Sequence, residues 1–226
     1  MPMDITMRPI GHLRTDLPEK FGVPRQSGLV EQLTGRIVFE PAFARQEAFR
    51  ELEGFSHIWV LWHFSQCADA PWHPTVRPPR LGGNRRVGVF ASRAPYRPNG
   101  IGLSCVRLVG IERGEGGVQL LVAGIDMVDG TPVLDIKPYI PLTDCRPQAT
   151  QGYTEQTRTH QLQVQWLPCA QGVLSPQQEQ ALHGLLQTDP RPGYEEDGEK
   201  SYGLAFADKQ VTFTVQNGVL TVQKIQ

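Results

Sequence analysis

Two short segments combine residue types that a plain scaffold does not need. Segment 92–102 (SRAPYRPNGIG) concentrates Pro, Gly, Arg and Asn, which gives a rigid irregular backbone with exposed N–H groups and two guanidinium groups. Segment 134–141 (LDIKPYIP) alternates apolar residues with Asp135, Lys137 and Tyr139. Because side chains alternate along a strand, these three would share one face and could form a pocket wall. The alternative is a strand whose polar face lies in solvent.

Arginines gather around the first of these segments. No Asp or Glu stands between Asp69 and Glu112, whereas this stretch holds seven arginines with Trp72, Phe90 and Tyr96 between them. Planar guanidinium groups pair bidentately with phosphate or carboxylate, and aromatic rings stack on bases. The stretch therefore predicts a surface that faces an anion or RNA, and the alternative is a set of separately solvated or structurally paired arginines. These arginines are Arg77, Arg80, Arg85, Arg86, Arg93, Arg97 and Arg107.

Motifs for several other chemistries are incomplete. Gly100 and Gly102 are followed by strand-like sequence instead of a helix, which argues against a Rossmann nucleotide-binding domain. Ser104 lacks the second Gly of a nucleophile elbow, so a serine hydrolase is not indicated. The histidines between residues 57 and 73 are not spaced as a metal-ligand pair, and the four cysteines form no CxxC motif. We therefore expect neither a metal site nor a disulfide framework.

The composition indicates a soluble folded protein. The 226 residues carry 22 Lys and Arg against 23 Asp and Glu, so the net charge of −1 does not by itself indicate a nucleic-acid or membrane binder. The high content of 23 Gly and 19 Pro favours a strand-rich fold with many turns. No basic stretch precedes an apolar core at the N-terminus, and no apolar run is long enough to span a membrane. We therefore expect a cytoplasmic protein.

The elements that must position these segments are mostly strands. Apolar patterning predicts strands over 5–12, 33–39 and 55–64, the last one buried on both faces, and several more between 87 and 140. A helix is expected from Pro41 to Leu52, and 71–86 reads as a long loop. Several consecutive strands predict a sheet or a small barrel as the core, within a mainly β fold.

The chain changes character after about residue 145. Residues 146–159 are polar and weakly patterned, as in a linker, and 160–226 contain signals of a small α+β unit. Ser175 to Gln178 form a capping box with Pro at the first helical position, which starts a helix with one apolar stripe. Asn217-Gly218 between two alternating runs predicts a hairpin. We therefore expect three parts, 1–145, 146–159 and 160–226.

Several segments together resemble one known family. The two segments described first, along with 76–84 (VRPPRLGGN), 20–26 (KFGVPRQ) and 189–194 (DPRPGY), resemble the TsaA-like (TrmO) family of tRNA N6-threonylcarbamoyladenosine methyltransferases. The similarity runs from near Ile10 to the C-terminal hairpin, with the motifs in the same order. The resemblance implies that a single-sheet β-barrel holds S-adenosylmethionine (SAM). It further implies a homodimer and a tRNA substrate that carries threonylcarbamoyl on N6 of adenosine 37, the nitrogen that is methylated.

The same resemblance implies four groups of cofactor-binding residues. Relatives often have His where this chain has Ser65, and a backbone contact there would survive the change. The groups are Gln26, Ser27 and Gly28; Ser65 and Gln66; Arg93 and Leu103; and Ala123, Gly124, Ile125 and Asp126.

Substrate-facing roles follow from the reaction that the resemblance implies. The acylated N6 nitrogen is poorly nucleophilic, so a base or a polarising donor should help, and we expect Asp135 as base with Lys137 and Tyr139 orienting or polarising. Asp126 is the second candidate for the base. The threonyl carboxylate needs a bidentate partner, for which we expect Arg97 or Arg191. We also expect RNA or substrate contacts from Arg77, Arg80, Arg86, Asn99 and Tyr194.

Two other functions remain open at this stage. One is a SAM-dependent methyltransferase of a small, non-RNA substrate, and the other is a SAM- or RNA-binding module without catalysis. The arginine-rich stretch favours RNA over a small molecule. The complete Arg-Pro-Asn and Asp-Ile-Lys-Pro-Tyr segments favour retained catalysis.

Overall fold

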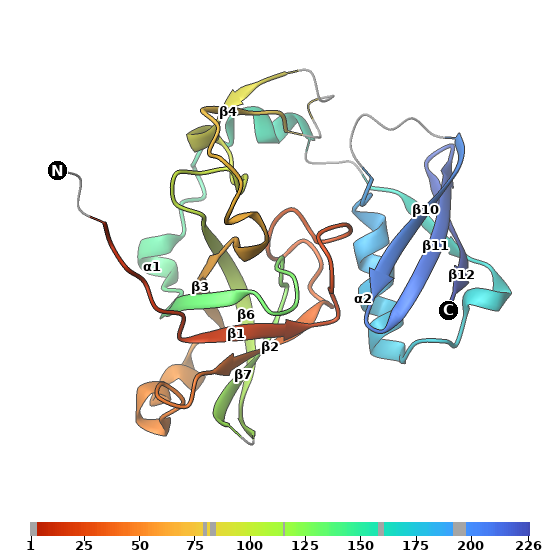
Figure 1. Ribbon diagram of the computed structural model, residues 1–226. Helices are drawn as coiled ribbons and strands as arrows, with labels where there is room; N and C mark the ends of the chain where they lie inside the picture. The colour runs from red at the N-terminus through yellow and green to blue at the C-terminus, as the bar shows by residue number, and fades with distance from the viewer. Residues whose placement is uncertain (1–3, 79–80, 82–84, 115, 158–160, 192–197) are drawn as a thin grey trace.

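The computed structural model describes residues 4–78, 81, 85–114, 116–157, 161–191 and 198–226, and strands dominate this part of the chain (Figure 1). Six antiparallel strands pair in the closed order β1-β2-β7-β6-β3-β8 and form a barrel. The mainly β fold class is therefore confirmed. These strands are β1 (Gly11–Thr15), β2 (Thr34–Phe39), β3 (His57–His63), β6 (Ile101–Gly114), β7 (Gly117–Ala123) and β8 (Pro132–Pro138).

The barrel interior follows from the alternation of side chains along each strand. On β3, Ile58, Val60 and Trp62 are buried and point inward, whereas the residues between them are only half-buried. The expectation that 55–64 is buried on both faces was therefore wrong. Both faces of this strand are apolar in sequence, but a strand in a barrel has one outer face, and only helices or a second sheet would cover it.

The helix expected between Pro41 and Leu52 is also wrong. This segment forms two short 3-10 turns, η1 (Gln46–Phe49) and η2 (Leu52–Gly54), and Glu51 between them has a left-handed φ of 67°. Phe49 packs edge-on against Phe39 with ring centroids 4.8 Å apart. Tertiary packing onto the barrel therefore overrides the helical periodicity of the sequence.

The described residues between β3 and β6 are largely irregular, as expected for 71–78 and 85–86, and residues 79–80 and 82–84 of the expected loop lie outside the described residues. The regular pieces of this stretch are η3 (Ser65–Cys67), the short antiparallel pair β4 (Thr75–Val76) and β5 (Val87–Gly88), and η5 (Val89–Ala91). In Figure 1 this stretch lies at one end of the barrel, and η1, drawn in orange, lies at the opposite end. The described arginines of this stretch are thus carried at one end of the barrel.

A second sheet forms the C-terminal unit. Its order is β10-β11-β12-β9, and the helix α2 (Pro176–Gln187) lies on the side that faces the barrel (Figure 1). The capping box at Ser175 and the Asn217-Gly218 hairpin are confirmed, with φ angles of 51° and 75° at the two turn residues. The strands are β9 (Gln163–Trp166), β10 (Gly198–Phe206), β11 (Lys209–Gln216) and β12 (Val219–Ile225).

The connection between the two sheets contains α1 (Pro141–Asp144) and η6 (Gly152–Thr157), and η7 (Pro168–Ala170) lies between β9 and α2. No helix in the described part of the chain is long and apolar enough to cross a membrane.

The barrel and the C-terminal unit share one apolar core and several hydrogen bonds. Asp16 accepts from the Gln178 side chain at 3.2 Å and, through its carbonyl, from the Ala207 N–H at 2.7 Å. Arg25 donates to the carbonyl of Arg191 at 3.0 Å. Buried residues of α2 belong to the same cluster as the barrel interior. The two units are therefore packed together at a polar and apolar interface.

A buried ion pair stands beside this interface. The Arg191 side chain donates to both carboxylate oxygens of Asp189, at 2.9 and 3.0 Å, and Arg191 is only 4% exposed. Removing one partner of a buried ion pair is strongly destabilising, because the remaining buried charge loses a counter-charge.

We predict that Asp189→Asn lowers the free energy of unfolding by about 3 kcal/mol, because the buried Arg191 loses its carboxylate partner. Urea denaturation of both proteins measures this difference. The control is Asp208→Asn, because the Asp208 side chain is 80% exposed in its pair with Lys209. This control should change the free energy by less than about 0.5 kcal/mol, and equal losses in the two variants would contradict the prediction.

Candidate functional site

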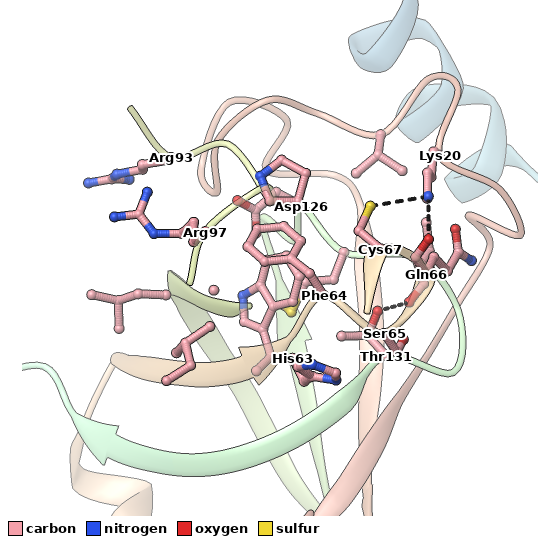
Figure 2. A pocket seen from close by; sticks show the side chains of 18 of the residues that line it. Lys20, His63, Phe64, Ser65, Gln66, Cys67, Arg93, Arg97, Asp126 and Thr131 are labelled. Atoms are coloured by element: carbon pink, nitrogen blue, oxygen red, sulfur yellow. Dashed lines mark hydrogen bonds between the residues drawn. The ribbon is translucent and has the colours of Figure 1, made fainter. Parts of the chain in front are cut away.

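A cavity of about 450 Å³ opens at the end of the barrel where β3 ends and β6 begins (Figure 2). Four segments line it, at 20–25, 62–67, 92–103 and 126–131. Trp62, Phe64, Leu103 and Met127 give it apolar walls, and a few polar groups converge on it from the loops. This volume and this lining are typical of a small-molecule site.

Strand pairing brings two of these segments together. His63 on β3 pairs with Ile101 on β6, and the Phe64 N–H donates to the carbonyl of Gly100 at 2.8 Å. A Cβ on Gly102 would lie 2.2 Å from the ring of Trp62, so only glycine allows the indole to lie against the neighbouring strand. Gly102 of the Arg-Pro-Asn-Gly-Ile-Gly run therefore serves this close packing.

A chain of hydrogen bonds ends on Asp126 at the cavity. The Ser104 hydroxyl donates to Oδ1 of Asp126 at 2.6 Å and accepts from the indole N–H of Trp62 at 2.9 Å. Burial raises the pKa of Asp126 to about 6, although the hydrogen bond from Ser104, the backbone of Ser27 and the charge of Arg93 act in the opposite direction. The cavity thus holds a carboxyl group that exchanges its proton close to neutral pH.

The segment 26–28 lies directly against 123–126. The Gly28 N–H donates to the carbonyl of Gly124 at 2.8 Å, and Ser27 Oγ accepts from the N–H of Cys105 at 3.1 Å. Gly124 has a φ of 77°, and a Cβ there would approach the backbone of Gly28 to 3.3 Å. The guanidinium of Arg93 donates to the side chain of Gln26. Two segments about 100 residues apart in the chain are therefore locked into one wall.

The structure brings the expected cofactor-binding residues into one region, although not all of them line the cavity. Ala123 and Ile125 are buried, with 1% and 0% exposure, and support the wall from behind. The residues that line the cavity are Ser65, Gln66, Arg93, Leu103 and Asp126. Those in the adjoining layer are Gln26, Ser27, Gly28, Ala123, Gly124 and Ile125.

The opposite wall contains a lysine that we did not expect at the site. Lys20 donates to the carbonyl of Gln66 at 2.7 Å, and its Nζ lies 3.2 Å from the Sγ of Cys67 (Figure 2). Lys20 thereby holds η3, and with it Ser65, at the mouth of the cavity. Its place in the segment KFGVPRQ was the available signal in the sequence.

The three residues expected to be catalytic share one face of β8 but do not line this cavity. Asp135 pairs in register with Leu61 and Lys137 with Trp59, which places them on the outer face of the barrel. The Lys137 ammonium lies 2.8 Å from the Asp135 carboxylate, which raises the pKa of Lys137. The Tyr139 ring lies 5.7 Å from that of Trp59. These side chains form a second polar surface, on β8.

The expected substrate-binding residues are divided among several places. Arg97 lines the cavity and donates to the carbonyls of Val89 and Ser92, at 3.1 and 2.8 Å. Arg191 is buried in its pair with Asp189 and is not part of the cavity wall. The Asn99 carbonyl accepts from Ile101 at the start of β6. Arg77 is exposed, Arg86 donates to Thr75 at 3.0 Å, and Arg80 and Tyr194 lie outside the described residues.

Sequence reasoning missed the roles of Trp62 and Ser104. Trp62 was assigned only to the core, and Ser104 was considered only as a nucleophile. A serine at an inward position of an otherwise apolar strand was the available signal, because a buried hydroxyl needs a partner. Among the described residues, no cluster of His, Cys, Asp or Glu could hold a metal ion.

The fold and the site define a class of protein that binds a small ligand at the end of a β-barrel instead of in a Rossmann domain. Comparison with known families narrows this class. Residues 12–145 match the tRNA-methyltransferase O N-terminal domain, and residues 159–226 match the TrmO C-terminal domain. The chain belongs to the TrmO family.

Relatives and a solved structure agree with this assignment. Over 214 residues, 91% of each chain, the sequence is 40% identical to a tRNA (adenine(37)-N6)-methyltransferase of Escherichia coli (strain K12). It is 41% identical over 218 residues, 92% of each chain, to a putative S-adenosylmethionine-dependent methyltransferase, RcsF, of Pseudomonas aeruginosa. A crystal structure of TrmO from P. aeruginosa superposes with a TM-score of 0.81 and 35% identity, covering 100% of this chain and 98% of that one.

The raised pKa of Asp126 predicts how stability depends on pH. A carboxyl whose pKa rises from 3.8 to about 6 on folding binds its proton more tightly in the folded state. Its contribution to stability is therefore complete below pH 3.8 and is lost as the pH rises through 6. We expect this group to lower the free energy of unfolding by about 2 kcal/mol between pH 4 and pH 7.

Urea denaturation across this pH range tests the prediction. Asp126→Asn should remove the loss, so that the variant gains on the wild type as the pH rises. Asp144→Asn is the control of opposite sign, because hydrogen bonds from Ile140 and Trp59 lower the pKa of Asp144. A constant difference between wild type and Asp126→Asn at all pH values would contradict the prediction.

Proposed function

We propose that this chain is a SAM-dependent tRNA methyltransferase that methylates N6 of N6-threonylcarbamoyladenosine at position 37. The relatives named as tRNA (adenine(37)-N6)-methyltransferases support the reaction and the position. The observation that carries the proposal is the cavity in which Ser65, Gln66, Arg93, Leu103 and Asp126 meet, beside the arginine-bearing stretch.

The residues at the cavity fit SAM. This molecule combines a flat adenine ring with a positively charged sulfonium and an amino-acid end that carries both charges. Trp62 and Phe64 offer aromatic surface, Asp126 offers a carboxylate to a cation or hydroxyl, and Arg93 offers a guanidinium to a carboxylate. When bound, SAM supplies an electrophilic methyl group. The barrel residues have to hold the acceptor nitrogen in line with it, about 3 to 3.5 Å away.

A general base must accept the proton that the acceptor nitrogen loses on methylation. Asp126 is suited to receive it, because it lines the cavity and its pKa of about 6 makes it mostly ionised at pH 7 yet still basic. We retain Asp135 as the other candidate, with Lys137 and Tyr139 orienting the base or polarising the carbamoyl oxygen from the surface on β8. Two variants, Asp126→Asn and Asp135→Asn, separate these roles when SAM binding and methyl transfer are measured for each. The base is the residue whose replacement lowers methyl transfer while SAM binding is kept.

The arginine-bearing end of the barrel is proposed to bind the anticodon arm. Arg77 and Arg86 would contact phosphates, and Arg97 would approach the threonyl carboxylate from the cavity wall. Phe90 is 74% exposed and Trp72 is 52% exposed, which supports stacking on unpaired bases. Contacts by Arg80, Asn99, Arg191 and Tyr194 remain predictions from the family resemblance.

A homodimer and a cytoplasmic location complete the proposal. Val109 on β6 is 42% exposed, and Ile140 and Leu142 are 43% and 90% exposed. Exposed apolar side chains of this kind support contact with a second copy of the chain. The division into a SAM-binding barrel over 1–145, a linker over 146–159 and a C-terminal unit over 160–226 is part of the same proposal.

The activity is tested by methyl incorporation from labelled SAM into two matched tRNA samples. One carries threonylcarbamoyl-adenosine and the other is unmodified. We predict label only in the modified tRNA, because the carboxylate of the modification supplies a partner for Arg97. Label in neither sample, despite measurable SAM binding, would favour a small-molecule methyltransferase or a non-catalytic SAM-binding module.

The RNA surface is tested by the salt dependence of tRNA binding. We predict that replacing Arg77 and Arg86 together by Ala weakens binding and reduces the slope of log K against log salt by about 2, because two phosphate contacts are lost. Arg50→Ala is the matched control, since Arg50 is an exposed arginine that directly follows η1. An unchanged slope in the double variant would exclude these phosphate contacts.

A further inference from the structure

A chain of two hydrogen bonds leads from Trp62 through Ser104 to Asp126. Neither the sequence motifs nor the names of the relatives assign a role to it. Ser104 lies on β6, is 0% exposed and stands between Trp62 and Asp126. Trp62 is 7% exposed, so water does not compete for its indole N–H. The three groups come from β3, β6 and the segment that follows β7, and they are joined by contacts of 2.9 and 2.6 Å.

The indole chemistry fixes the direction of the first hydrogen bond, and the charge of ionised Asp126 sets that of the second. An indole N–H can only donate, and a serine hydroxyl has a single hydrogen. Because Ser104 Oγ accepts from Trp62, its own hydrogen is available for Asp126 Oδ1. While Asp126 is ionised, the Ser104 hydrogen already occupies Oδ1. Oδ2 is therefore the oxygen that can take a proton without first displacing this hydrogen bond.

We propose that Ser104, oriented by Trp62, is a positioning residue that commits Oδ1 of Asp126 as an acceptor and makes Oδ2 the oxygen that takes and releases the proton. One part of this proposal rests on the proposed function, namely that the proton taken up by Asp126 comes from the nitrogen that is methylated. The arrangement itself is a property of the free protein, and it can be tested without SAM or tRNA.

Other charged groups around the cavity act on Asp126 as well. Arg93 favours its ionised form, and the remaining charged or titratable side chains in the lining are Lys20, Arg25, His63, Cys67 and Arg97. A change at Ser104 alters none of these charges. A shift caused by Ser104→Ala therefore reports the lost hydroxyl and not a changed electrostatic environment.

The test is a titration of Asp126 by carbon-13 NMR of its carboxyl group in the ligand-free protein. Ser104→Ala removes a donor to the carboxylate while burial remains, so we expect the midpoint to move upward by about one pH unit. Trp62→Phe keeps an aromatic ring but removes the indole donor that orients and polarises the Ser104 hydroxyl, so its hydrogen bond to Asp126 is weakened. We expect a smaller upward shift from this variant.

Two further variants serve as rescue and control. Ser104→Thr keeps the hydroxyl and should restore the wild-type midpoint. Ser92→Ala removes another hydroxyl of the cavity lining, one that donates to the carbonyl of Val89, and should leave the midpoint unchanged. If Ser104→Ala does not fold, Ser104→Cys retains the volume with a weak donor and should give the same upward shift. An unchanged midpoint in Ser104→Ala or Ser104→Cys, or an unchanged midpoint in Trp62→Phe, would overturn the proposal.

Activity measurements distinguish this proposal from the proposed function. If Asp126 receives the proton in methyl transfer, the acidic limb of the pH–rate profile should move with the NMR midpoint in Ser104→Ala and return in Ser104→Thr. A moved midpoint with an unmoved profile refutes the assignment of this proton to the reaction. A moved midpoint without methylation of any tRNA refutes the proposed function and leaves the positioning by Ser104 intact.

Discussion

The antiparallel register between β3 and β6 is the constraint on which the site depends. It places Trp62 opposite Gly102, so that the indole lies over the neighbouring strand, and it points Ser104 inward to meet the indole N–H. A slip of one residue would turn both side chains to the outer face. The register thus determines the floor of the cavity, the supply of hydrogen bonds to Asp126 and the point at which the arginine-bearing stretch leaves the barrel.

The site separates two kinds of charge. The carboxyl group of Asp126 lies inside, where burial raises its pKa. Interactions with Ser104, the backbone of Ser27 and Arg93 lower that pKa again in part. Guanidinium groups lie outside or along the rim, where Arg97 is already fixed by two backbone carbonyls and Arg93 by Gln26. This division suits an enzyme that acts on an anionic polymer with a cationic methyl donor, because the cation finds a negative partner inside and the phosphates find positive partners outside.

Much of the fold could be predicted from the sequence, and the failures have physical causes. The hairpin and the helix cap depend on local rules at Asn217-Gly218 and Ser175, which tertiary contacts do not override. The 41–52 segment failed because packing of Phe49 on Phe39 outweighs helical periodicity, and β10 was missed because its alternation is weak. The family resemblance pointed to segments that lie together in the structure, and their role in cofactor binding stays a prediction. It could not give the long-range register that turns Ser104 into a donor or places Asp135 on an outer face.

The closure of the barrel has a consequence for its folding and internal motion. β1 and β8 are paired at only two positions, Gly11 with Val133 and His12 with Pro132, although about 120 residues separate them in the chain. This short ladder is extended by hydrogen bonds from Ile10 to Val133 and from Leu13 to Thr131, at 2.8 and 2.9 Å, so the closure of the barrel depends on few contacts between distant parts of the chain. Thr131, at the cavity lining, directly precedes this ladder. A molecule bound in the cavity would therefore stabilise the pairing of β1 with β8. It would slow the exchange of backbone amide hydrogens in these strands, including those that it does not contact.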